Sequence, residues 1–131
     1  MNKDKIVEFF QDEIVKMNKT IDLVNQIGNL PNGARYLSLS ALTIEVRNLK
    51  DLETLKAFLY RKLGWKGKIV PPYVWSSGGK IYADFRDDAY ALSVWLCMPP
   101  EEFPDNLIPG ARLVELVPEV NRQFKYVREE E

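Results

Sequence analysis

One stretch of the chain, from residue 64 to residue 88, is rich in both aromatic and basic side chains. Its candidate surface residues are Trp65, Lys66, Lys68, Tyr73, Trp75, Lys80 and Tyr82. Flat rings beside ammonium groups can hold single-stranded nucleic acid, because bases stack on the rings while the ammonium groups meet phosphates. Tryptophan and tyrosine also dominate the contacts between proteins. The stretch therefore predicts a binding surface for one of two classes of partner.

The charge pattern separates these two classes. Residues 54–83 carry six basic side chains and no acidic one, whereas residues 84–105 carry six acidic side chains and one arginine, within a net charge of −1. Nucleic-acid-binding domains are usually basic overall. We therefore expect a protein partner that is acidic or mixed in charge, with nucleic acid or a small nucleotide as the alternative. A further alternative is that Trp75 and Trp95 belong to the core and that Tyr82 is incidental, since strand side chains alternate between faces.

The chain lacks the residues that several kinds of catalysis require. Histidine is absent and Cys97 is the one cysteine. Their absence removes Ser-His-Asp and Cys-His nucleophile systems, cysteine-based zinc sites and Cys-x-x-Cys redox chemistry. We therefore expect a protein that is not an enzyme and that has no metal ion and no cofactor.

Carboxylates offer the remaining catalytic alternative. The candidates are Asp84, Asp87, Asp88 and Glu102. Paired carboxylates serve glycoside hydrolysis and divalent metal sites, but Asp87-Asp88 is also suited to a hairpin turn. A carboxylate-dependent hydrolase is therefore a distant alternative. The segment 76–80, Ser-Ser-Gly-Gly-Lys, lacks the spacing of a phosphate-binding loop and predicts a plain turn.

A long N-terminal helix is predicted from about residue 4 to residue 27. Its heptad seam consists of Val7, Phe10, Ile14, Met17, Ile21 and Val24. Gly28 suits the end of the helix, and Pro31 prevents its continuation. The seam can pair with a second copy, which predicts a homo-oligomer, or it can cover the sheet of its own chain. Apolar residues beside the seam, such as Ile6 and Phe9, widen the face, so both interpretations stay open.

A strand pattern and a second helix follow. Residues 36–47 alternate as a strand, but the phase changes between Ala41 and Leu42, which predicts a bulge or two short strands that meet at a bend. Residues 49–63 form a leucine-rich helical face. Asn48 is suited to cap the start of this helix.

The second half of the chain predicts strands joined by short turns. Residues 68–75 form a strand that Pro71-Pro72 interrupts, so this strand should lie at an edge or contain a bulge. Ile81, Ala83 and Phe85 form the inner face of the next strand. Residues 90–98 are strongly apolar and predict a central strand. Further extended segments are predicted at 112–117 and 122–127.

These elements predict an α+β fold: one curved, mainly antiparallel sheet of four to six strands, with a long N-terminal helix and a second helix packed on one face. We expect one domain over residues 1–131, with the N-terminal helix at 4–27 and a mixed α/β body at 34–128. No apolar run approaches the length of a membrane span, the charged start is unlike a secretory signal, and one cysteine fits a reducing compartment. A cytoplasmic location is therefore expected.

The functional expectation follows from these exclusions. We expect a non-enzymatic binding module that acts through protein–protein interaction as a small intracellular accessory or inhibitor-like protein. Short chains with few catalytic residues and many aromatic ones are common among the accessory proteins of phages and other mobile elements, although no motif in this sequence supports that origin.

Overall fold

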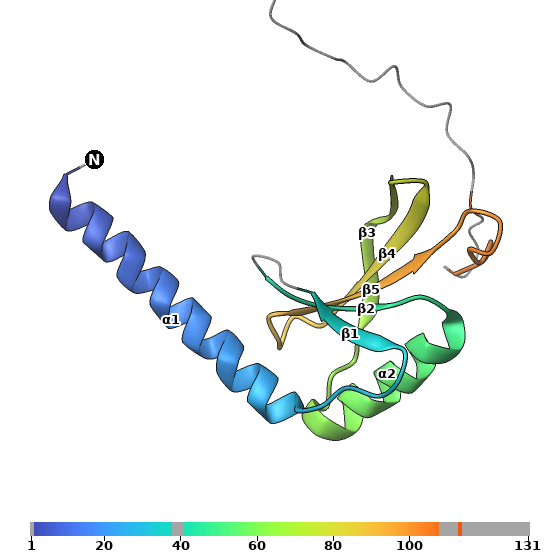
Figure 1. Cartoon of the computed structure of the whole chain (residues 1–131), viewed down its shortest axis with the longest axis horizontal. Coiled ribbons are helices and arrows are strands. Elements are labelled where there is room, and N and C mark those ends of the chain that lie inside the picture. The colour runs from blue at the N-terminus through green and yellow to red at the C-terminus, as the bar shows by residue number, and fades with distance from the viewer. Residues whose placement is uncertain (1, 38–40, 108–112, 114–131) are drawn as a thin grey trace, which may run out of the picture.

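The described part of the chain folds into two helices and one five-stranded sheet. The computed structural model describes residues 2–37, 41–107 and 113, without the side chains of 71–73. The elements are α1 (Lys3–Ile27), β1 (Ala34–Leu37), β2 (Leu42–Val46), α2 (Leu49–Leu63), β3 (Lys68–Ser77), β4 (Lys80–Arg86) and β5 (Leu92–Met98). The predicted α+β class is confirmed (Figure 1).

The sheet has the strand order β1-β2-β5-β4-β3. All neighbouring strands are antiparallel except β2 and β5, which run parallel. The apolar strand β5 lies in the middle of the sheet, as predicted. β3 lies at an edge, and its register with β4 shifts between Ile69 and Val74. The shift encloses Pro71-Pro72, which have no backbone N–H to donate to a ladder.

The change of alternation at residues 41–42 marks a hairpin. β1 and β2 are separate strands that pair antiparallel, with Ala34 opposite Val46 and Leu37 opposite Thr43. The alternative of two short strands is therefore confirmed. The segments predicted as strands at 112–117 and 122–127 lie outside the described residues, apart from Leu113.

α2 covers one face of the sheet and supplies much of the core. Its Leu52, Leu55 and Leu59 are buried. The sheet residues that pack in the same core include Ile44, Val46, Ala83, Phe85, Val94 and Leu96. Replacing one such leucine by alanine typically costs about 2–5 kcal/mol.

Capping residues define both ends of α2. The Asn48 side chain accepts a 2.8 Å hydrogen bond from the Asp51 amide, which satisfies one of the free donors in the first helical turn. Gly64 ends the helix with a φ of 76°, a left-handed conformation that suits glycine.

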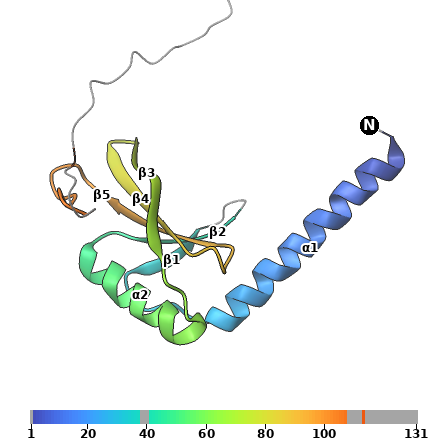
Figure 2. The same cartoon turned by 180° about the vertical axis from the view of Figure 1, so that it is seen from behind.

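α1 contacts the rest of the protein through its C-terminal part. Ile27 is buried, and Leu23 and Val24 pack partly against the core. The preceding turns extend away from the sheet (Figures 1 and 2), and their large apolar side chains are exposed. Coverage of the chain's own sheet is therefore confined to the end of α1.

Candidate binding surfaces

Trp75, Tyr82 and Trp95 form an aromatic cluster on the face of the sheet that α2 does not cover. The rings of Trp75 and Tyr82 stack, with centroids 5.3 Å apart and planes 12° apart. Trp95 meets both rings edge-on, at centroid distances of 5.2 and 5.9 Å. Three neighbouring strands thus each contribute one half-buried ring, and stacked and edge-on pairs are both favourable arrangements.

Strand alternation explains the position of this cluster. Tyr82 lies between Ile81, which packs partly against the core, and the core residue Ala83. Trp95 lies between the core residues Val94 and Leu96 of β5, so both rings point to the opposite face. Trp75 is the register partner of Tyr82 and shares that face. The alternative in which Trp75 and Trp95 belong to the core therefore does not hold.

Two buried carboxylates lie on the same face as the aromatic cluster. The Glu45 carboxylate forms ion pairs with Arg35 at 2.9 Å and with Arg47 at 3.2 Å. Asp84 pairs with Arg86 at 2.8 Å. The three arginine side chains are more than half exposed, whereas Glu45 and Asp84 are buried. The solvent-facing layer of this face is therefore basic.

The environment of this face changes two pKa values. Burial raises the pKa of Asp84, and the charge of Arg86 partly opposes that effect. A hydrogen bond with the Cys97 thiol and partial burial raise the pKa of Tyr82.

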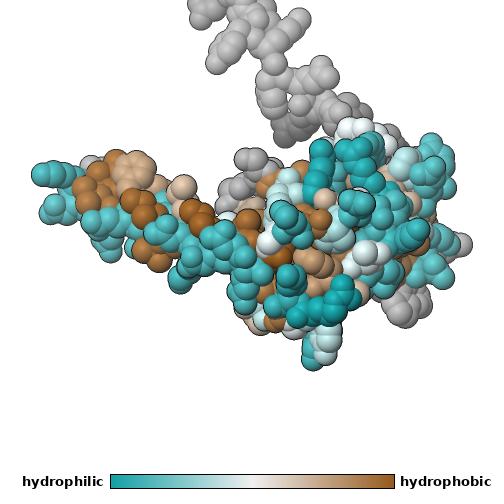
Figure 3. All heavy atoms as spheres, turned by 60° about the horizontal axis from the view of Figure 1, so that its bottom comes forward, coloured by the Kyte–Doolittle hydropathy of each residue, from teal (hydrophilic) through white to brown (hydrophobic). Residues whose placement is uncertain are grey.

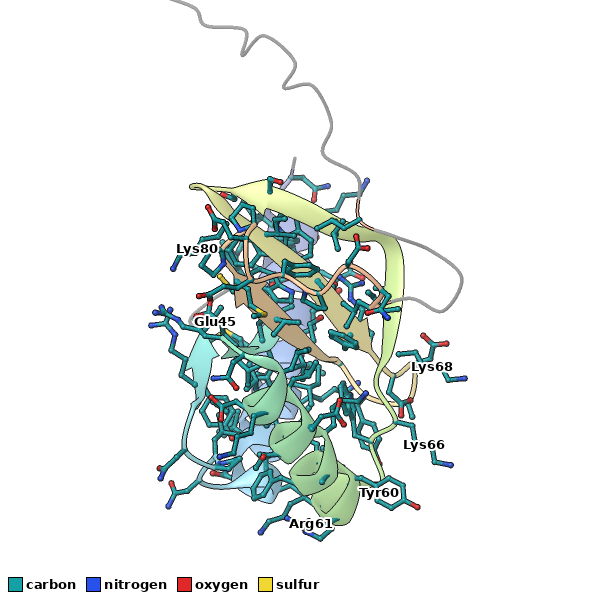
Figure 4. All side chains as sticks on the ribbon, turned by 90° about the vertical axis from the view of Figure 1, so that its right-hand side faces the viewer. Glu45, Tyr60, Arg61, Lys66, Lys68 and Lys80 are labelled. Atoms are coloured by element: carbon teal, nitrogen blue, oxygen red, sulfur yellow. The ribbon has the colours of Figure 1, made fainter. Side chains whose placement is uncertain are left out.

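The lysines of the predicted surface lie at two separate places. Lys80 pairs in register with Ser77 at the β3–β4 turn, whereas Lys68 pairs with Arg86 at the other end of these strands. Figure 4 shows Lys80 well away from Lys66 and Lys68. The lysines of the predicted surface are therefore divided between the two ends of β3 and β4.

Lys66 and Lys68 border a shallow hollow beside α2. Lys56, Tyr60 and Trp65 also line this hollow, which has a volume of about 420 Å³. Three lysines and one carboxylate, that of Glu53, line the hollow. The excess of positive charge attracts anions, so this second place is a candidate anion site.

Trp65 does not belong to an exposed binding surface. Its side chain is 1% exposed and packs in the core cluster, because the backbone turns at Gly64 directly after α2. Gly67 lies against the indole ring, where a Cβ would collide with it. The prediction of Trp65 as a contact residue is therefore wrong. The side chain of Tyr73 lies outside the described side chains.

The heptad seam of α1 is largely exposed. Val7, Phe10, Ile14, Met17 and Ile21 are 44–62% exposed, and Val24 is the seam residue that packs partly against the body. Figure 3 shows hydrophobic residues along the projecting helix. The structure thus presents five of the six predicted self-association residues to the outside.

Two of the acidic residues of the hydrolase alternative are engaged by other groups. Asp84 pairs with Arg86, and Asp87 accepts hydrogen bonds from the Lys66 and Ala89 amides at 2.7 and 3.0 Å. These backbone hydrogen bonds lower the pKa of Asp87. Within residues 2–37, 41–107 and 113, no three His, Cys, Asp or Glu side chains gather closely enough to hold a metal ion.

Sequence reasoning missed part of each candidate site. Arg35, Glu45 and Arg47 join the aromatic cluster through β1 and β2, which no local pattern connects to β4. Lys56 and Tyr60 join Lys66 through the turn after α2. The sequence does contain one signal for Glu45, its position between the apolar residues Ile44 and Val46. Because the side chains of a strand alternate between faces, this position directs Glu45 away from the core.

Comparisons with protein-family models, curated proteins and solved structures found no match. Neither described helix combines the length and the apolar character that crossing a membrane requires.

Proposed function

We propose that the protein is a non-enzymatic binding module that acts through protein–protein contacts and self-associates through α1. The observation that carries the proposal is the exposed seam of α1. The large apolar side chains along one face of the projecting helix stay in contact with water until another surface covers them. Covering that face contributes hydrophobic stabilisation. The partner that we commit to for α1 is a second copy of this chain.

The aromatic cluster supports a second contact in the same module, with a different protein. Trp75 and Tyr82 offer flat rings, and arginines more than half exposed pair with the carboxylates of the same face. Aromatic and arginine side chains are enriched among the residues that dominate protein interfaces. The basic layer favours an acidic surface on the partner, through charge complementarity.

Static light scattering on a matched pair of variants tests self-association. Ile14 and Val15 are both exposed neighbours in α1, but Val15 points away from the seam. We expect the wild type and the Val15→Asp variant to have twice the mass of one chain, and Ile14→Asp to have the mass of one chain. A wild-type monomer at high concentration would contradict the proposal.

A capture experiment from the native host tests the sheet face. The Trp75→Ala and Tyr82→Ala variants should recover less of the partner than the wild type, while circular dichroism shows that they fold. Lys19→Ala on α1 serves as the control, because Lys19 lies outside this face. Unchanged capture by both folded aromatic variants would remove the sheet face from the proposal.

A nucleotide or single-stranded nucleic acid is the second candidate, and the hollow between Lys56, Lys66 and Lys68 favours it. Phosphate contacts make affinity fall as salt rises, with a slope set by the number of neutralised phosphates. We expect an oligonucleotide bound there to lose affinity with salt, and the Lys66→Ala and Lys68→Ala variants to reduce the slope. No binding of an oligonucleotide or of a nucleotide panel at low salt would eliminate this candidate.

We place the protein in the cytoplasm as part of this proposal. Cys97 is a buried free thiol, and free cysteines are typical of reducing compartments.

A further inference from the structure

We propose that two copies form a two-fold dimer in which the α1 helices pack antiparallel, so that the N-terminal half of each helix fills a groove of the other copy. This inference rests on the self-association through α1 proposed above, and it specifies the partner surface and the direction of the helices.

The groove lies between α1 and the β1–β2 hairpin of the same chain. Its volume is about 270 Å³. Its walls are Met17, Thr20 and Ile21 of α1 and Leu37, Ala41 and Leu42 of the hairpin, and the ion-paired Glu13 and Lys16 of α1 also line it. Met17 and Ile21 also belong to the seam. The seam of each helix therefore continues into a mainly apolar groove, which an apolar helix face can fill.

The N-terminal half of α1 carries the side chains that fit such a groove. Ile6, Phe9 and Phe10 are 43–58% exposed, and the two phenylalanine rings pack edge-on with centroids 5.6 Å apart. Phe10 and Ile21 are separated by eleven residues, which corresponds to about 16 Å along a helix. One end of the helix thus presents a bulky apolar group, and the other end borders a hollow.

A two-fold axis near residues 15 and 16 brings these two ends together. In that register Phe10 of one copy faces Ile21 of the other, Ile14 faces Met17, and Val7 faces Val24. An isologous contact requires that each such pair occurs twice, and this register pairs all six seam residues. Phe10 then lies at the mouth of the groove of the other copy.

A parallel pair fits the structure less well. Each body lies on the seam side of its own α1, as the groove shows. Parallel helices would bring both bodies to the same end, into the space that the second helix needs. The N-terminal halves would meet each other, and both grooves would stay empty.

The exposed area approaches that of a stable dimer. Six large apolar side chains on or beside the seam are 43–62% exposed: Ile6, Val7, Phe10, Ile14, Met17 and Ile21. Side chains of this size at half exposure offer roughly 600 Å² per chain, which is most of the ~800 Å² per partner of a standard interface.

Cysteine cross-linking tests the direction of the helices. The full chain with Cys97→Ala, which removes the native thiol, receives either Phe10→Cys or Ile21→Cys, and one of the two chains carries a tag that separates the products on a gel. After mild oxidation we expect a mixed disulfide between the Phe10→Cys chain and the Ile21→Cys chain. We expect no disulfide-linked dimer when either variant is oxidised alone. We also expect none when a Val15→Cys chain replaces either variant in the mixture.

The outcomes separate this inference from the proposed function. Self-linking of the Phe10→Cys chain in a dimeric sample means parallel helices, which overturns the inference and leaves self-association intact. A monomer by light scattering overturns both. Binding of α1 to a different protein in place of a second copy gives the monomer result for the isolated chain.

A groove variant gives an independent measurement. Ala41 is exposed and lies on the hairpin, away from α1 itself. Ala41→Asp places a charge in the groove, so we expect the antiparallel dimer to dissociate at least about tenfold more readily in analytical ultracentrifugation. A parallel pair leaves the groove empty, and an unchanged dissociation constant would therefore count against the antiparallel arrangement.

Discussion

The Tyr36 hydroxyl donates a 2.7 Å hydrogen bond to the carbonyl oxygen of Gly28. This contact joins β1 to the residue that ends α1. Burial raises the pKa of Tyr36, which favours the protonated phenol that donates this hydrogen bond. Together with Ile27, which is buried in the core, this hydrogen bond sets the direction in which α1 leaves the body.

Replacing Tyr36 by phenylalanine should loosen α1 at its attachment. The loss of one hydrogen bond typically lowers the free energy of unfolding by about 1 kcal/mol. We expect faster hydrogen exchange in the last turn of α1, measured by mass spectrometry, and a small loss in a urea titration. Tyr60→Phe is the matched control, since Tyr60 is exposed on α2. Equal exchange in the Tyr36→Phe variant and the wild type would show that packing alone holds the helix.

The stacked pair of Trp75 and Tyr82 should be energetically coupled. Aromatic pairs contribute about 0.5–1.5 kcal/mol beyond the area that they bury. A double-mutant cycle of Trp75→Ala and Tyr82→Ala, measured by urea denaturation, should therefore return a coupling of that size. Strict additivity of the two single variants would mean that the rings contribute only as separate apolar surfaces.

Asp84 and Asp87 should give stability opposite dependences on pH. The raised pKa of Asp84 means that the folded state holds its proton more tightly, so its contribution is greatest below the ordinary pKa of about 4 and falls as pH rises through the raised value. The lowered pKa of Asp87 has the reverse effect. Its contribution is present above the ordinary pKa and is lost as pH falls through the lowered value.

Isosteric amide variants separate these two effects. Between about pH 7 and pH 3, lowering the pH should increase the stability of the wild type relative to Asp84→Asn and decrease it relative to Asp87→Asn. Urea titrations at several pH values give both differences. The same direction of change for both variants would contradict the pKa assignments.

Gly67→Ala should destabilise the protein through the Trp65 ring. A Cβ at residue 67 would collide with the indole, and overpacking typically costs about 1–3 kcal/mol. The smaller ring of Trp65→Phe should recover part of that loss in the double variant. Thermal denaturation of the two single variants and the double variant measures the recovery, and its absence would locate the strain elsewhere.

Local signals predicted the helices and the alternation of the strands. Asn48 and Gly64 fix the ends of α2 through hydrogen bonds and backbone geometry within a few residues, so sequence alone contains them. Gly28 does the same for α1. The inner face of β4 followed from alternation, because each side chain of a strand points opposite to its neighbour.

Long-range pairing decided what the sequence left open. The neighbours of Trp95 come from β2 and β4, and no local pattern states that β2 lies beside β5. Trp65 follows a helix end, where periodicity no longer assigns a face, and its burial depends on the small residue at 67. The seam of α1 has the same spacing whether a sheet or a second helix covers it, so the spacing could not divide its buried end from its exposed turns.

The parallel pairing of β2 with β5 has a consequence for biosynthesis. Leu42 pairs with Leu92, fifty positions later, so the centre of the sheet cannot close until the chain has been synthesised well past residue 92. α1 leaves the ribosome long before that moment, with its apolar face complete. Nascent chains on one messenger RNA therefore carry an exposed apolar helix face ahead of an unfinished body, and chaperone protection should matter most during that interval.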